Sequence, residues 1–225
     1  MKNPERTSTF FDGYAADFSS IYGGKATLLT RVLSRLFRKS MVMRYVRTLE
    51  GCRPIEGRSV LDVGCGPGHY GIALARMGAA RVVGIDFAPA MIELARHRAE
   101  AAGVARSCEF VCSDFMADPP AGQFDYTVVM GFMDYVRDPA AVIQRVLALT
   151  RRKAFFSFPA EGGLLAWQRK IRYRRKCDLF MYRQEQLLKL FESAHPARVE
   201  IDRMARDFFV TVTDPRRQGD NGEKT

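Results

Sequence analysis

From residue 59 onward, short β-rich runs alternate with stretches of helical pattern, and this alternation restricts the possible folds more than any other feature of the chain. The β-rich runs are Ser59–Cys65, Arg81–Phe87, Cys108–Asp114, Phe124–Met130 and Ala154–Phe158. The helical stretches between them lie near Tyr70–Met77, Pro89–Ala102 and Pro139–Leu149. Because parallel strands joined through helices form right-handed crossovers, this order predicts an α/β fold with a doubly wound, mostly parallel sheet and helices on both faces.

A different pattern follows the fifth run. A helical region at about Arg183–Ser193 precedes two further β-like runs, Arg198–Met204 and Asp207–Thr213, which only two residues separate. So short a link joins antiparallel strands and cannot form a parallel crossover. The sheet is therefore predicted to end in an antiparallel C-terminal hairpin. Residues 216–225 are polar and are predicted to form a disordered tail.

The 225 residues suffice for one compact domain with additions at its ends. Residues 1–50 are predicted to form an N-terminal helical arm or lid, residues 51–215 the main domain, and residues 216–225 the tail. Within the arm, apolar residues recur at helical spacing from Leu28 to about Leu49, with cations between them. This spacing predicts a basic amphipathic helix.

The net charge of +10 is unevenly distributed. Seven cations fall between Lys25 and Arg47, and a second basic cluster spans residues 169–176. Such segments can be ordinary solvated helix faces. Alternatively, segments 25–47 and 169–176 form a surface for an anionic membrane or a phosphorylated acceptor. The sequence leaves both interpretations open.

Composition excludes several classes of protein. No run approaches the roughly 20 apolar residues of a membrane-spanning helix, and residues 1–24 lack the apolar stretch of a secretory signal. The protein is therefore expected in the cytoplasm, either free or peripherally at a membrane. The five cysteines are scattered and include no Cys-x-x-Cys pair, so neither a disulfide framework nor a metal site is expected.

The first β-rich run, Ser59–Gly68, passes from a buried strand into a glycine-rich turn and then into a helix. Glycines let a backbone turn sharply and approach a ligand closely, and the start of a helix offers unpaired N–H groups. The loop is therefore expected to hold a nucleotide-like ligand. Its predicted contact residues are Gly64, Cys65, Gly66 and Gly68.

Two cofactors fit this arrangement, NAD(P) and S-adenosylmethionine. The dinucleotide fingerprint G-x-G-x-x-G requires a third glycine where this chain has His69. Asp62, just before the loop, would repel a diphosphate and attract the ammonium and sulfonium groups of S-adenosylmethionine. The spacing and the charge both favour S-adenosylmethionine, with an NAD(P)-dependent oxidoreductase as the alternative.

The next two strands also end in acids. Asp86, followed by Phe87, lies where a carboxylate can accept the hydroxyls of an adenosine ribose. At Ser113-Asp114-Phe115, a carboxylate could accept the adenine amino group and the aromatic ring could pack on the base. Three acids at three successive strand ends predict one continuous adenosine site.

In this order, several segments resemble the motifs of class I S-adenosylmethionine-dependent methyltransferases. They are Val60–Gly68, Gly84–Asp86, Met91, Ser113–Phe115 and Phe124–Asp125, and the resemblance spans roughly residues 58–160. It implies a Rossmann-like sheet of seven strands in the order 3-2-1-4-5-7-6, with S-adenosylmethionine as cofactor. It further implies that Asp62 and the glycines hold the methionine part, Asp86 the ribose and Asp114 the adenine.

The segment Met130–Arg137 follows the fourth strand and is expected to line the mouth of the site, with Met130 and Gly131 beside the cofactor. Asp134 and Tyr135 are the candidates to orient an acceptor. Equally, Asp134 could cap the next helix while its apolar neighbours pack. His69 is a further candidate base, although a capping or solvent-facing role fits the start of a helix as well.

Within the superfamily, residues 10–22 resemble the lid of methyltransferases that act on quinone precursors or magnesium protoporphyrin. By that resemblance Tyr14 and Tyr22 would close over the cofactor. The chain departs from the porphyrin enzymes at Asp134, where those enzymes are expected to have histidine. The favoured function is methyl transfer to a small molecule, most readily at oxygen. A lipid-linked or phosphorylated glycan, RNA, and a non-catalytic nucleoside-binding role remain alternatives.

Overall fold

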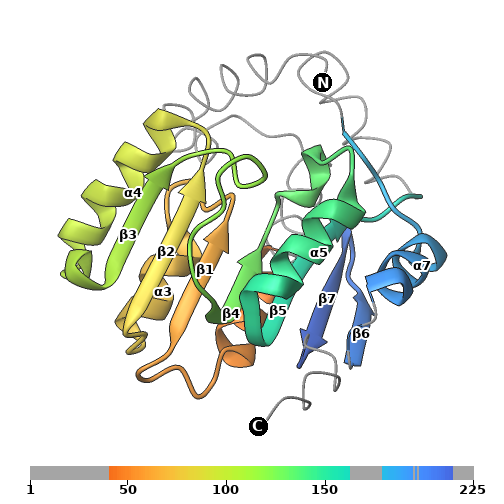
Figure 1. The fold of residues 1–225 in the computed structure, drawn as a ribbon, viewed down its shortest axis with the longest axis horizontal. Helices are drawn as coiled ribbons and strands as arrows, with labels where there is room; N and C mark the ends of the chain where they lie inside the picture. Colours follow the sequence, from red (N-terminus) through yellow and green to blue (C-terminus); the bar gives the residue numbers. More distant parts are fainter. Residues whose placement is uncertain (1–40, 163–178, 195, 197, 215–225) are drawn as a thin grey trace, which may run out of the picture.

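The computed structural model describes residues 41–162, 179–194, 196 and 198–214. A seven-stranded sheet forms the centre of the molecule, with the strand order β3-β2-β1-β4-β5-β7-β6 (Figure 1). The strands are β1 (Ser59–Val63), β2 (Arg81–Asp86), β3 (Cys108–Cys112), β4 (Phe124–Val129), β5 (Thr150–Pro159), β6 (Arg198–Arg203) and β7 (Asp207–Thr213). The first five strands pair in parallel, whereas β7 pairs antiparallel with both β5 and β6. The predicted fold class and strand order are confirmed.

Helices cover both faces of this sheet, as predicted. They are α3 (His69–Arg76), α4 (Pro89–Ala101), α5 (Pro139–Leu149) and α7 (Gln184–Ala194), with an earlier helix over residues 41–51. Short 3-10 turns occur at η2 (Ala105–Ser107) and η3 (Met133–Tyr135). None of the described helices is long and apolar enough to cross a membrane.

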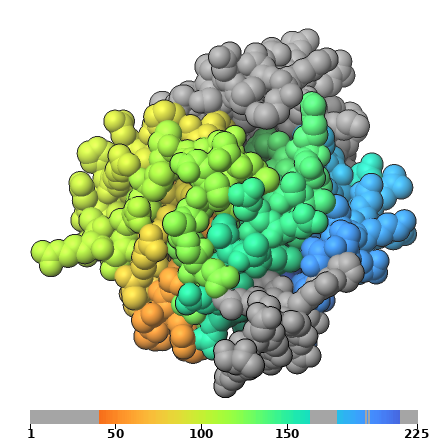
Figure 2. Space-filling model, in the orientation of Figure 1, coloured from red at the N-terminus to blue at the C-terminus, as the bar shows by residue number. Residues whose placement is uncertain are grey.

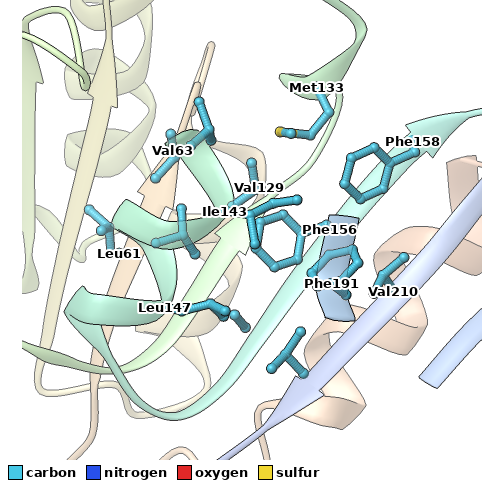
Figure 3. Close-up of a cluster of buried hydrophobic side chains, with 14 of the residues drawn as sticks. Leu61, Val63, Val129, Met133, Ile143, Leu147, Phe156, Phe158, Phe191 and Val210 are labelled. Atoms are coloured by element: carbon cyan, nitrogen blue, oxygen red, sulfur yellow. The ribbon is translucent and has the colours of Figure 1, made fainter. Parts of the chain in front are cut away.

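The largest apolar cluster lies between the sheet and α5 and α7 (Figure 3). Ile143 and Leu147 of α5 and Phe191 of α7 pack there against alternate residues of the strands, including Phe156 and Val210. In the same orientation as Figure 1, Figure 2 shows this face with α5 in blue-green near the middle and α7 in blue at one side. Side chains alternate between the two faces along each strand, so one set of them is buried under α5 and α7.

The opposite face carries α3 and the helix over residues 41–51. Leu74 of α3 packs with Val60, Tyr126 and Phe155 from three strands. At the end of the earlier helix, Gly51 lies so close to the sheet that an added β-carbon would come within 2.5 Å of the Phe155 ring. The predicted boundary between arm and main domain, at residues 50 and 51, therefore falls inside a continuous helix that packs on the sheet.

Several predicted strand boundaries need correction, including the end of β4, which is Val129 rather than Met130. β5 begins at Thr150 rather than Ala154, because Lys153 still pairs with Thr213 of β7 and Thr150 with Phe124 of β4. β1, β2 and β3 each end before the predicted last residue, since the backbone leaves the sheet ladder there to enter a loop. The hairpin link comprises three residues rather than two, because β6 ends at Arg203.

Candidate active site

The glycine loop turns sharply at the carboxyl end of β1. Gly64, Gly66 and Gly68 have φ angles of 67°, 51° and 77°, a region that favours glycine. The amides of Gly64 and Cys65 both donate to the carbonyl of Ile85, at 2.8 and 3.0 Å, which holds the loop against β2. An added β-carbon at Gly64 would approach the Phe132 ring to 2.6 Å. The loop is thus bounded by the segment that follows β4.

Open space borders this loop at two glycines. A β-carbon built on Gly66 or on Gly131 would meet nothing within 4 Å, whereas one on Gly68 would come within 3.2 Å of Phe110, Ile72 and Ala95. Gly131, with a φ of 75°, follows directly after β4 and Met130. The two open glycines come from the adjacent strands β1 and β4 at the carboxyl edge of the sheet, where ligands bind in such folds.

Asp86 ends β2 and supports the same loop. Its Oδ2 accepts a hydrogen bond from the Gly66 amide at 2.9 Å, and its Oδ1 accepts one from the Ala88 amide at 2.9 Å. The side chain is only partly buried. Because each carboxylate oxygen has more than one lone pair, Asp86 can hold the loop and still accept hydroxyl groups from a ribose.

Asp62, the last acid before the glycine loop, has a buried carboxyl group. It is 1% exposed, and its Oδ2 accepts a hydrogen bond from the amide of Gly71 in α3 at 3.2 Å. The direct contact of Asp62 with the methionine part stays a prediction, and in this structure the buried carboxyl group binds the start of α3. In this structure Asp62 fastens the first turns of α3 beneath the loop.

Burial raises the pKa of Asp62 to about 7; the Gly71 amide opposes this shift and the charge of Asp86 adds to it. The folded protein then binds more protons than the unfolded chain between about pH 4 and about pH 7, so the free energy of unfolding falls as pH rises through this window. We expect Asp62→Asn to remove this fall, so that from about pH 5 to about pH 8 wild type loses roughly 3 kcal/mol relative to the variant. Urea unfolding at both pH values measures this, and a pH-independent difference would contradict the raised pKa.

The third acid, Asp114, lies just beyond β3. It is exposed, and its Oδ1 accepts a hydrogen bond from the Met116 amide at 2.8 Å. The amide of Ser113 donates to the Asp86 carbonyl at 3.0 Å, so the ends of β2 and β3 are tied together. Phe115, in contrast, is 3% exposed and belongs to the main core. Its packing on an adenine stays a prediction, and in this structure the ring packs within the core.

The other predicted cofactor residues differ in exposure. Cys65, Met91 and Met130 are all buried, and burial raises the pKa of the Cys65 thiol well above its ordinary value. Phe87 is partly buried, and its carbonyl accepts from the Cys112 thiol at 3.7 Å. Of these residues, Phe87 alone retains side-chain surface beyond a small fraction. Tyr14 and Tyr22 lie outside the described residues.

The two residues predicted to orient an acceptor, Asp134 and Tyr135, differ in their burial. Asp134 is 2% exposed within η3, and its carbonyl accepts from the Phe180 amide at 2.8 Å. Nearby, burial raises the pKa of Tyr182 to about 12, and the charge of Asp134 adds to the shift. The orienting role of Asp134 stays a prediction; in this structure its backbone bonds to residue 180 and its charge acts on Tyr182. Asp134 does not cap α5: Asp138 does, accepting from the Ala141 amide at 3.1 Å.

Tyr135 and His69 keep more accessible positions. Tyr135 is partly buried at the end of η3. His69 is exposed at the first residue of α3, and its Nε2 lies 3.3 Å from a guanidinium nitrogen of Arg98 in α4. Partial burial and the Arg98 charge lower the pKa of His69, so the ring is neutral at neutral pH. The described residues include no group of three or more His, Cys, Asp or Glu side chains that could hold a metal ion.

Several polar residues at this edge were not predicted. Arg44 of the helix over residues 41–51 contacts Ser157 and Asp207, and Ser157 also accepts a hydrogen bond from the Gly131 amide. No local pattern in the sequence identifies these residues, because Arg44 lies more than 100 positions from both Ser157 and Asp207 in the chain. In the sequence, Arg44 counted only as one cation of a basic segment.

The arrangement suits a ligand with the groups of S-adenosylmethionine. Open space lies over backbone at Gly66 and Gly131, and Asp86 and Asp114 stand at neighbouring strand ends with oxygens available to hydroxyl and amino groups. Ionised acids at this edge attract a cationic ligand, whereas the diphosphate of a dinucleotide would be repelled. The residues present therefore fit a cationic adenosine cofactor.

Known proteins resemble the chain in sequence and in structure. A family model described as a methyltransferase domain matches residues 60–153. The magnesium-protoporphyrin O-methyltransferase of Rhodobacter capsulatus is 36% identical over 183 residues, which cover 77% of this chain and 75% of that protein. A ubiquinone biosynthesis O-methyltransferase of Paracidovorax citrulli is 36% identical over 104 residues, which cover 46% of this chain and 43% of that protein.

A solved structure shows the same fold. The magnesium protoporphyrin IX methyltransferase from Synechocystis PCC 6803, crystallised with bound SAH, superimposes with a TM-score of 0.71 at 18% sequence identity. The match covers 94% of this chain and 99% of that one. At this identity the likeness supports the fold alone.

Proposed function

Because this chain belongs to the class I S-adenosylmethionine-dependent methyltransferases, we propose that it methylates a carboxylate oxygen of a small-molecule acceptor. Its relatives identify S-adenosylmethionine as the methyl donor and small molecules as the acceptor class. The NAD(P)-dependent alternative is thereby set aside. The choice of a carboxylate oxygen, and of the residues that act on it, is our proposal.

The choice of atom rests on what surrounds the acceptor side of the described site. A phenol must lose a proton during methyl transfer, whereas a carboxylate is already ionised at neutral pH. Of the three candidate residues, Asp134 is 2% exposed, His69 lies beside Arg98 of α4, and Tyr135 is partly buried at the end of η3. An acceptor that needs no base fits this environment best.

The protein's part in the reaction is then binding and alignment. S-adenosylmethionine supplies a methyl group on a sulfonium that departs as a neutral thioether. The glycine loop and Asp86 would hold the nucleoside, and the turn at Gly131 would border the reacting groups. Holding two reactants in line removes much of the entropic barrier, which can account for most of the acceleration of such a displacement.

Magnesium protoporphyrin is the first acceptor to test, because the relative that matches most of this chain is named for it. Purified protein would be incubated with S-adenosylmethionine and magnesium protoporphyrin, its dimethyl ester, or a polyprenyl catechol. We expect the free acid to gain one methyl as a base-labile ester and the dimethyl ester to gain none. A base-stable ether on the catechol alone, or methylation of the blocked porphyrin, would refute the carboxylate proposal.

We also propose that the protein binds an anionic membrane peripherally, where an apolar acceptor would partition. Val42, Met43 and Val46 are 59%, 42% and 42% exposed on the helix over residues 41–51, and the chain carries a net charge of +10. Within segment 25–47, Arg44 and Arg47 already form ion pairs with Asp207 and Asp202. The other cations of that segment, which precede residue 41, and residues 169–176 lie outside the described residues.

Flotation with phosphatidylglycerol vesicles at low salt tests membrane binding, with phosphatidylcholine vesicles as control. We expect binding to the anionic vesicles only, weakened by salt and by Val42→Ser with Val46→Ser. Equal recovery with both lipids, or none with either, would refute it. Binding that is insensitive to the two serine substitutions would remove the apolar helix face from the proposal.

A further inference from the structure

A buried arginine links the helix over residues 41–51 to the carboxyl edge of the sheet. The side chain of Arg44 is 13% exposed. Its Nη1 lies 3.3 Å from the Ser157 hydroxyl of β5 and 3.5 Å from Oδ2 of Asp207 in β7. The charge of Arg44 also acts on Tyr70, in the first turn of α3, where it opposes the rise that burial causes in the pKa of the phenol. One side chain thus joins β5 and β7 near the end of the sheet that carries the glycine loop.

Ser157 connects Arg44 to the backbone that follows β4. Its hydroxyl oxygen accepts a hydrogen bond from the Gly131 amide at 2.8 Å and a second one from Arg44. A hydroxyl has two acceptor lone pairs, so both bonds can exist together. Ser157 is 1% exposed, and no solvent competes for these bonds. The start of the segment after β4 is therefore fixed from the side of the sheet that carries Arg44.

The fixed backbone is the turn that, in the proposed function, would border the reacting groups. Gly131 has a left-handed φ of 75° and open space where a β-carbon would lie. One residue further, Phe132 packs over Gly64 of the glycine loop. A shift of the Gly131 turn would consequently move the boundary of the site toward or away from the loop.

Asp207 adds an ion pair with Arg44 to these hydrogen bonds. It is 5% exposed and faces Arg44 across the sheet edge. A buried charge that loses its partner is strongly destabilising, so the two residues hold each other in place. The ion pair keeps the guanidinium in reach of Ser157, although Arg44 and Asp207 lie 163 positions apart in the chain.

We propose that Arg44 is a positioning residue for methyl transfer, which acts through Ser157 on the Gly131 turn. It touches neither donor nor acceptor in this proposal. Its loss should therefore lower the rate of transfer while leaving the affinity for S-adenosylhomocysteine nearly unchanged. The proposal depends on methyl transfer as the reaction and is independent of which acceptor is methylated.

The test separates positioning from simple stability. Arg44→Met removes one charged partner of the buried Asp207, so the double variant Arg44→Met, Asp207→Asn removes both charges together. Ser157→Ala removes the acceptor for Gly131 without changing any charge. Arg81→Met is the matched control, since Arg81 forms an exposed ion pair with Glu109, at 3.1 Å, near the opposite ends of the strands.

We expect the double variant and Ser157→Ala to keep a melting temperature within a few degrees of wild type. With magnesium protoporphyrin, their kcat should fall roughly 10- to 100-fold, while S-adenosylhomocysteine affinity by calorimetry changes less than about threefold. Arg81→Met should match wild type in both. A double variant that regains stability and wild-type kcat together would overturn the proposal, because Arg44 would then serve stability alone.

Hydrogen exchange at the Gly131 amide supplies a readout that needs no acceptor. In the presence of S-adenosylhomocysteine, we expect this amide to exchange at least about tenfold faster in Ser157→Ala and in the double variant than in wild type. Unchanged protection in both would refute the positioning role. Should wild type not methylate the porphyrin, the acceptor proposal fails, and the exchange rates alone decide the role of Arg44.

Discussion

Replacement of Asp86 with alanine is expected to weaken the binding of S-adenosylhomocysteine by at least about 100-fold, or roughly 2.8 kcal/mol. The carboxylate accepts hydrogen bonds from the amides of Gly66 and Ala88, both at 2.9 Å, and it is predicted to accept hydrogen bonds from the ribose hydroxyls as well. Its loss would remove the ligand contact and loosen the loop at the same point. Hydrogen bonds to a charged group are each worth about 1.5–3 kcal/mol, so two or three of them suffice.

Calorimetric titration of wild type and Asp86→Ala with S-adenosylhomocysteine measures this effect. Asp125→Ala is the matched control, because Asp125 also accepts a backbone amide, that of Ser59 at 3.0 Å, but does so at the amino ends of β1 and β4. We expect the control to bind with wild-type affinity. A variant at position 86 that binds within about threefold of wild type would remove Asp86 from the predicted ribose site.

The second large effect is expected from Gly66→Asn. Asparagine adopts a left-handed backbone more readily than most residues, so the φ of 51° can be kept. The added side chain would meet no protein atom within 4 Å of its β-carbon, and it would instead fill the space predicted for the cofactor. We expect S-adenosylhomocysteine affinity to fall about 100-fold, a loss of roughly 2.8 kcal/mol.

Gly57→Asn provides the control for the backbone. Gly57 has a φ of 71° and open space for a β-carbon, but it precedes β1 and lies at the other end of that strand. Thermal unfolding of the two variants should shift by similar amounts, a few degrees at most, since each introduces the same residue in a left-handed conformation. Full cofactor binding by Gly66→Asn would show that the ligand does not pass over this glycine.

Much of the fold could be predicted because its signals are local. The alternation of strands and helices from Ser59 onward and the short link before Asp207 each occupy neighbouring residues, and they indicate the order of elements without any knowledge of contacts. The start of β5 was missed for the same reason. Arg151, Arg152 and Lys153 look like a polar link, and the pairing of Thr150 with β4 and of Lys153 with β4 and β7 keeps this segment in the sheet.

The site was predictable in its backbone and less so in its side chains. Three glycines with left-handed φ angles follow from the spacing of the loop alone. Whether an acid at a strand end faces the ligand depends on neighbours that are distant in the chain. Asp62 is covered by Gly71 and α3, and Asp134 turns toward residues 180–182, which join the site only through the folded sheet.

The place of β7 in the sheet has a consequence for the order of events during synthesis. β7 lies between β5 and β6, yet it follows every other strand in the chain. Until residues 207–213 leave the ribosome, the edge of β5 has no partner, and Arg44 has no carboxylate to meet although it was made 163 residues earlier. A nascent chain can therefore contain the whole glycine loop and still lack the residues that support it. A messenger RNA truncated shortly before codon 207 would encode the cofactor motifs without the strand and the carboxylate that hold them in position.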